Sequence, residues 1–148
     1  MKANLTKSTK SVKGKEIVRQ WHLVDANKKI LGRMIPEITH FLQGKHKANY
    51  ISHLDSGDYV VVVNVDAVRV TGSKQSSKVY TRYSGYPGGL KKISYAKMKQ
   101  EKPEEIIRHA VSGMLPKNKL RDRRMTRLFV FKGSTHTYED KLKIKYKK

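Results

Sequence analysis

Residues 55–64, Asp-Ser-Gly-Asp-Tyr-Val-Val-Val-Val-Asn, contain the longest uninterrupted run of β-branched apolar residues in the chain. The four valines do not alternate with polar residues, which is typical of a strand that is buried on both faces. A buried helix segment is the alternative, but the run is short for a helix and valine loses side-chain freedom there. We therefore expect the central strand of an α/β fold, a three-layer α/β/α arrangement around a mainly parallel sheet.

Four further segments, two strands and two helices, are expected to build the fold around this strand. Residues 20–26 are strand-like, and apolar residues spaced by three and four from Ile30 to Leu42 predict a helix that ends at Gly44. Pro36 falls inside that helix, where proline removes a backbone hydrogen bond. Pro103 is placed to begin another helix, and residues 128–131 form a last apolar strand before Gly133.

The length and composition set the class of protein. A chain of 148 residues fits one domain with its own core, and the absence of cysteine excludes disulfides and thiolate metal sites. No segment has the length and apolarity of a membrane span, so we expect a soluble protein. We expect a basic, flexible arm at residues 1–15, a single domain at 16–133 and a basic tail at 134–148; a solvated arm without a role is the alternative.

Charge indicates the partner. The chain has 33 lysines and arginines against 12 acidic residues, a net charge of +21. Such an excess repels itself unless a polyanion neutralises it, and nucleic acid is the commonest polyanion. An anionic membrane surface is the weaker alternative, because no basic amphipathic helix stands out.

Three sets of residues are candidates for RNA contacts. The first follows the predicted helix end, at Lys45, His46 and Lys47, with Lys74 further along the chain. The second is a glycine-rich loop in which aromatic rings could stack on bases and amines could hold phosphates, with a plain connecting loop as the alternative; it contains Tyr83, Gly85, Tyr86, Gly88, Gly89, Lys91 and Lys92. The third is a cationic turn and helix suited to phosphate, with Lys117, Lys119, Arg121, Arg123, Arg124 and Arg127.

Other site types have little support in the sequence. Gly32 after a strand is a single glycine and not a dinucleotide fingerprint, and the spacing of His46, His53 and Asp55 matches no metal-ligand pattern. No carboxylate pair with a base, nucleophile elbow or phosphate loop is present. We therefore expect no catalytic residue, metal, cofactor or small-molecule substrate.

Several motifs together resemble the large-subunit ribosomal protein thirteen family over about Trp21 to Gly133. They are Val24-Asp25-Ala26, Leu31-Gly32-Arg33, Gly44-Lys45-His46-Lys47, Gly57-Asp58-Tyr59, Val70-Thr71-Gly72-Ser73-Lys74, Ser84-Gly85-Tyr86-Pro87-Gly88-Gly89-Leu90-Lys91 and Gly113-Met114-Leu115-Pro116-Lys117. The resemblance implies a four-stranded, mainly parallel sheet and a structural, non-enzymatic protein of the large ribosomal subunit in the cytoplasm. It also implies direct binding to 23S ribosomal RNA, a role in early subunit assembly and neighbouring large-subunit proteins as partners. A free RNA-binding regulator or a small nuclease is the alternative.

Overall fold

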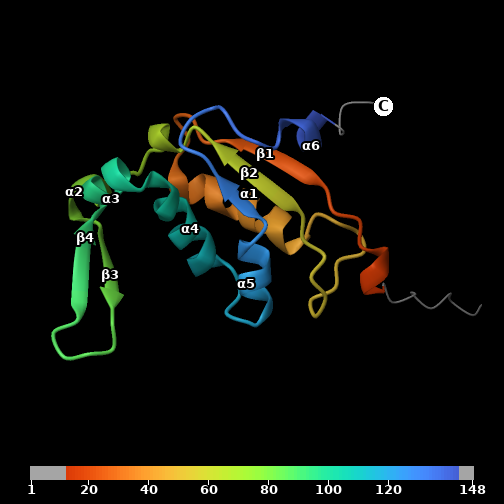
Figure 1. The fold of residues 1–148 in the computed structure, drawn as a ribbon, viewed down its shortest axis with the longest axis horizontal. Coiled ribbons are helices and arrows are strands. Elements are labelled where there is room, and N and C mark those ends of the chain that lie inside the picture. Colours follow the sequence, from red (N-terminus) through yellow and green to blue (C-terminus); the bar gives the residue numbers. More distant parts are fainter. Residues whose placement is uncertain (1–12, 144–148) are drawn as a thin grey trace, which may run out of the picture.

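The structure is a computed structural model that describes residues 13–143 (Figure 1). Most of the expected arm and the end of the expected tail lie outside these residues. The elements in chain order are η1 Gly14–Glu16, β1 Trp21–Asp25, α1 Leu31–Gln43, β2 Tyr59–Val63, η2 Val65–Ala67, α2 Lys74–Ser77, β3 Val79–Tyr83, β4 Leu90–Ser94, α3 Tyr95–Glu101, α4 Pro103–Met114, α5 Leu120–Met125, β5 Leu128–Val130 and α6 Glu139–Lys143. No helix within residues 13–143 is long and apolar enough to cross a membrane.

The valine run forms β2, which is the middle strand of a parallel sheet in the order β1-β2-β5. Leu23 of β1 and Phe129 of β5 lie opposite Val61 on its two sides. The prediction of a central parallel strand is therefore confirmed. The sheet has three strands within the described residues and not the expected four; an isolated parallel bridge joins Ile30 to Arg69.

Helices α1 and α4 cover one face of the sheet, where their apolar sides meet Val60 and Val62. The left-handed Gly44, with φ of 78°, ends α1 as predicted, and its N–H donates to the carbonyl groups of His40 and Phe41. Pro36 lies inside α1. Pro103 begins α4.

The opposite face of the sheet is covered by aromatic side chains instead of a second layer of long helices. The Trp21 ring stacks on Tyr59 and on Tyr138, with ring centroids 4.4 and 5.1 Å apart. The chain around Tyr138 and the short α6 pass over this face beside β1 (Figure 1). Val61 is fully buried here, so two-sided burial of β2 is confirmed although the third layer is thin.

Strands β3 and β4 form a separate antiparallel hairpin that projects from the body (Figure 1). The alternation of side chains from Lys78 to Ser84 predicts a third or edge strand, and β3 is a strand, but in this hairpin and not in the central sheet. The loop predicted at residues 85–92 already contains the start of β4 at Leu90. Tyr80 anchors the base of the hairpin, because its ring lies 5.6 Å from His109 of α4 and packs against the core.

Candidate nucleic-acid interface

The tip of the β3–β4 hairpin exposes two of the predicted aromatic residues, with Tyr83 63% and Tyr86 76% exposed. Gly85 and Gly88 have φ of 91° and 73°, in the left-handed region that favours glycine. At Gly89 a Cβ atom would lie 2.0 Å from Ser84 Oγ and 2.9 Å from the Tyr86 carbonyl oxygen, so a side chain here would force both the serine and the backbone of the turn to shift. The glycines therefore hold a turn that presents both rings to solvent.

The cations of the hairpin lie on both of its faces. Arg82 and Lys91 are cross-strand partners on one face, and Lys92 lies opposite Thr81 on the other. All three are exposed and form no ion pair within residues 13–143. The hairpin thus brings together aromatic rings and unpaired cations, a combination suited to stacked bases and phosphates.

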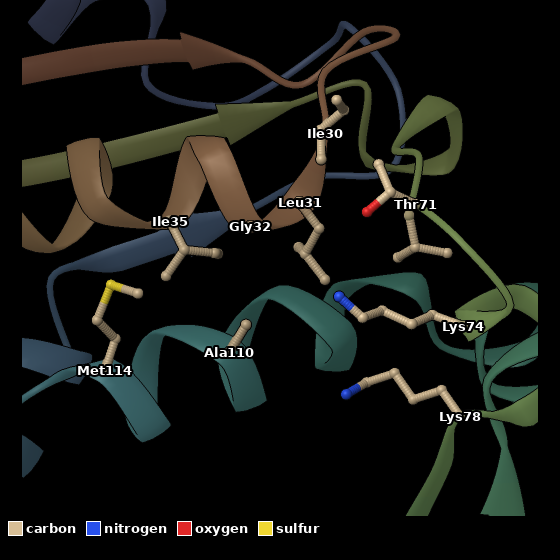
Figure 2. A pocket seen from close by; sticks show the side chains of 10 residues that line it. Ile30, Leu31, Gly32, Ile35, Thr71, Lys74, Lys78, Ala110 and Met114 are labelled. Carbon is tan, nitrogen blue, oxygen red and sulfur yellow. The ribbon is translucent and has the colours of Figure 1, made fainter.

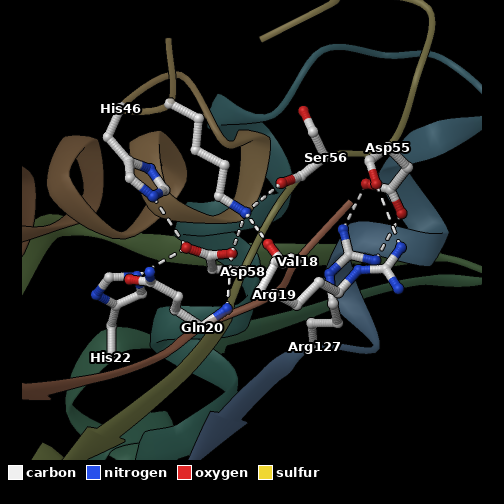
Figure 3. A network of polar contacts seen from close by, with 10 residues as sticks. Val18, Arg19, Gln20, His22, His46, Asp55, Ser56, Asp58 and Arg127 are labelled. Carbon is white, nitrogen blue, oxygen red and sulfur yellow. Dashed lines mark hydrogen bonds and ion pairs between the residues drawn. The ribbon is translucent and has the colours of Figure 1, made fainter. Parts of the chain in front are cut away.

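Two of the three predicted contact residues after α1, His46 and Lys47, contact Asp58 of the same chain. Lys47 Nζ donates to Asp58 and to the carbonyl oxygens of Val18 and Ser56, at 2.8 and 2.9 Å for the carbonyls. His46 Nε2 lies 2.9 Å from the Asp58 carboxylate (Figure 3). Lys45 remains exposed. Lys47 is thus held inside the protein, whereas Lys45 can reach a partner.

The electrostatics of Asp58 follow from this network. Burial alone would raise the pKa of its carboxyl, but hydrogen bonds from His22, Lys47 and the Gln20 N–H outweigh burial and lower the pKa to about 2. Burial also lowers the pKa of His46, although the charge of Asp58 opposes that effect. Asp58 is therefore an anion at neutral pH, and Lys47 is its main counter-charge.

Within residues 13–143, this network also contains the one cluster of histidine and acidic side chains that is close enough to hold a metal ion. Ligand atoms of His22, His46 and Asp58 lie within 4.8 Å of one another, a different trio from the one that the sequence offered. The ammonium of Lys47 already contacts the Asp58 carboxylate and would repel a cation placed there. We interpret the trio as part of a salt-bridge network.

The predicted arginine cluster on and after α5 divides into buried and exposed members. Arg127 donates to both oxygens of Asp55, and Arg124 Nε lies 3.7 Å from the same carboxylate (Figure 3 shows Arg127). Arg124 and Arg127 are only 1% and 6% exposed. Arg123, like Lys117 and Lys119, faces solvent, and Arg121 is half-buried with its Nε 3.8 Å from Asp122. The exposed members can reach a phosphate backbone.

Lys74 lies on the short helix α2, beside a residue that the sequence-based prediction omitted. Lys78 follows the same helix as its C-cap, and both side chains line a pocket next to α1 and α4. The spacing of four residues is the signal that could have paired them, because residues four apart share one face of a helix.

Comparison with known proteins identifies the relatives of this chain. The family described as ribosomal protein L13 matches residues 19–137. A protein of Clostridioides difficile is 55% identical over 123 residues, which cover 83% of this chain and 86% of the relative. A protein of Caldanaerobacter subterraneus subsp. tengcongensis is 50% identical over 127 residues, covering 86% of this chain and 89% of the relative. Both relatives are named large ribosomal subunit protein uL13.

Proposed function

The chain belongs to the ribosomal protein L13 family, and on that premise we propose that it binds 23S ribosomal RNA directly and supports early assembly of the large subunit. Members of this family are structural proteins and not enzymes, and the relatives are named as large-subunit proteins. The chain is therefore a structural ribosomal protein of the large subunit. The proposed RNA contacts hold the chain in the large subunit. Neighbouring large-subunit proteins are its further proposed partners in the cytoplasmic ribosome.

The projecting hairpin is the observation that carries the proposal. A two-stranded hairpin is marginally stable by itself, and this one keeps an exposed tip with large aromatic rings. Exposed tyrosines and unpaired cations gain little in water, but on RNA the rings stack and the cations replace counterions. The hairpin is therefore best explained as an element that is ordered against RNA.

We also propose different roles for the predicted contact residues, according to their exposure and ion pairs. We assign RNA contact to those that face solvent and internal support to Lys47, Arg124 and Arg127, whose charges already pair with Asp58 and Asp55. The solvent-facing members are Lys45, His46, Lys74, Tyr83, Gly85, Tyr86, Gly88, Lys91, Lys92, Lys117, Lys119 and Arg123, with half-buried Arg121 and Gly89 at their edges.

Sedimentation and direct binding test the proposal. In a fractionated lysate the protein should run with large subunits, and the purified chain should bind a 23S rRNA fragment with an affinity that falls as salt rises. A protein found mainly among free proteins, or one that binds a regulatory RNA in preference to rRNA, would support the free-regulator alternative.

The hairpin is tested by Gly88→Val. Valine at φ of 73° is strained and should distort the loop, lowering rRNA affinity by about tenfold, the effect of ~1.4 kcal/mol. The thermal midpoint should change little, because the tip lies away from the core. Gly113→Val is the control, since Gly113 is exposed on α4 with open space beside its Cα. Equal binding by both variants would remove the hairpin from the interface.

A further inference from the structure

A pocket of about 230 Å³ lies between the first turn of α1, the C-terminal half of α4 and the segment around α2 (Figure 2). It is smaller than the ~300 to 1,000 Å³ typical of sites for drug-sized ligands, so it suits one ring system and not a whole cofactor. Its lining is mainly apolar, with Thr71 and two lysines as polar members: Ile30, Leu31, Gly32, Ile35, Val70, Thr71, Lys74, Lys78, Ala110 and Met114.

Two ammonium groups border this apolar lining. Figure 2 shows the side chains of Lys74 and Lys78 extending in parallel toward α1 and α4, with both nitrogen atoms on the pocket side. Neither lysine pairs with a carboxylate in the part of the chain that the structure describes; Lys78 Nζ lies 5.1 Å from the Tyr80 ring centre. Like charges four residues apart repel each other, and a shared anion would relieve that repulsion.

The first turn of α1 adds a backbone donor. The Gly32 N–H makes no hydrogen bond to another backbone group within residues 13–143, and it lies at the positive end of a 13-residue helix. A Cβ atom at Gly32 would meet nothing within 4 Å, so the space beside this residue, which lines the pocket, is open. An anion held by the two lysines would have the helix start as a further source of positive potential.

An anion joined to a flat, largely apolar ring satisfies both parts of the pocket. Free phosphate would leave the apolar lining unused, and an apolar side chain of another protein would leave the ammonium pair unneutralised. We propose that the pocket binds one unstacked nucleotide, with its base against the apolar lining and its phosphate at Lys74, Lys78 and the Gly32 N–H. The proposal rests on the proposed function, because rRNA would supply that nucleotide from a single-stranded loop or bulge.

Amide chemical shifts of the isotope-labelled full chain test the site directly. The probes are AMP and UMP, with inorganic phosphate and the nucleosides adenosine and uridine as the two halves of the ligand. The nucleotides should shift the amides of Gly32, Thr71 and Lys74 and bind more tightly than either half. Phosphate that binds as well as the nucleotides, nucleosides that bind as well, or no shift with any probe would overturn the proposal.

Two variants connect the pocket with RNA. Gly32→Leu fills the open space at a helical position, and Lys74→Gln with Lys78→Gln removes the charges; each should weaken nucleotide and rRNA-fragment binding by about tenfold. The controls are Gly113→Leu and the pair Lys97→Gln with Lys102→Gln, at exposed positions that do not line the pocket. If the pocket variants bind rRNA like their controls, this inference fails while the proposed function stands. If the wild-type chain does not bind rRNA, the proposed function itself fails.

Discussion

Asp58 receives hydrogen bonds from segments far apart in the sequence: the Gln20 N–H, the His22 ring and the Lys47 ammonium. The carboxylate is fully buried, so each of these donors replaces a water molecule that it lost on folding. The network therefore joins the start of β1, the end of α1 and the start of β2.

Asp58→Asn should lower the free energy of unfolding by roughly 3 kcal/mol, because it leaves the Lys47 ammonium, only 14% exposed, without its counter-charge. Urea unfolding measures the change. Asp122→Asn is the control, since that side chain is 88% exposed and its loss should matter by less than about 0.5 kcal/mol. Equal stability of the two variants would show that the Asp58 network does not support the fold.

The pKa of Asp58 also predicts how stability depends on pH. The folded pKa of about 2 lies below the unfolded value of 3.8, so the group contributes about 2 kcal/mol at higher pH, and this is lost as pH falls through that window. The lowered pKa of His46 acts in the same direction from its unfolded value of 6.5 downward, because the folded state resists its protonation. Unfolding across pH should show both decreases, and Asp58→Asn should lack the more acidic one.

Sequence alone could not separate the buried cations from the exposed ones. Lys47 and Lys45 are two residues apart in the same loop, yet only Lys47 meets Asp58, which lies 11 residues away. Arg127 meets Asp55 across 72 residues. Such pairs depend on the tertiary arrangement. The local charge pattern therefore predicted a cationic surface, but it did not show which lysines and arginines would be buried in ion pairs with Asp55 and Asp58.

At the scale of elements, α5 combines both kinds of cation within six residues. Its buried side points Arg124 toward Asp55, and its outer side presents Arg123 to solvent. Arginines that are adjacent in the sequence thus lie on two sides of the helix. Mutation of the exposed ones should affect RNA binding, and mutation of the buried one should affect stability.

Arg121→Gln with Arg123→Gln should reduce the slope of log affinity against log salt for an rRNA fragment by about 1.5, at roughly 0.7 to 0.9 per phosphate contact. Thermal stability should hardly change. Arg127→Gln should instead lower the free energy of unfolding by roughly 3 kcal/mol, because Asp55 loses its bidentate partner. Binding across salt concentrations and urea unfolding, done on both variants, measure the two effects. A reversed pattern would contradict the division of the arginine cluster into a buried and an exposed set.

Elements with strong local signals were predicted well, and the hairpin was not. Helix α1 has a regular apolar spacing and a terminal glycine, and β2 has its valines. Strand β4 carries two lysines and follows a glycine-rich turn, so it has no buried face to mark it in the sequence. Because β3 is also mostly exposed, nothing local indicated that it pairs with β4 and not with the central sheet.

For the whole molecule, the layers could be predicted only on the side that helices cover. The apolar faces of α1 and α4 indicated one cover for the sheet, whereas the other cover depends on Trp21, Tyr59, Phe129 and Tyr138 meeting from four separate segments. The net charge of +21 was evident from composition. Repulsion among these charges opposes folding of the whole domain and not of one element.

The free protein should become more stable as salt rises, in the opposite direction to its affinity for RNA. Its charges repel one another, and raising salt from about 0.01 M to 1 M shortens the screening length from roughly 30 to 3 Å. The pairs of Asp55 and Asp58 are buried and should be screened little. We expect a gain on the order of 1 kcal/mol, about 3 °C in the thermal midpoint, measured in sodium chloride because sulfate strengthens apolar burial generally.

A variant with four exposed lysines changed to glutamine isolates this effect. Replacing Lys91, Lys92, Lys117 and Lys119 lowers the net charge from +21 by 4, to +17. With less repulsion to screen, the variant should melt higher than the wild type at low salt and gain less from added salt. It should also bind an rRNA fragment more weakly and with a shallower salt slope, because these lysines are proposed phosphate contacts. A midpoint that stays flat with salt in both proteins would mean that the excess charge is spread widely enough not to oppose folding, and that its effect is confined to RNA binding.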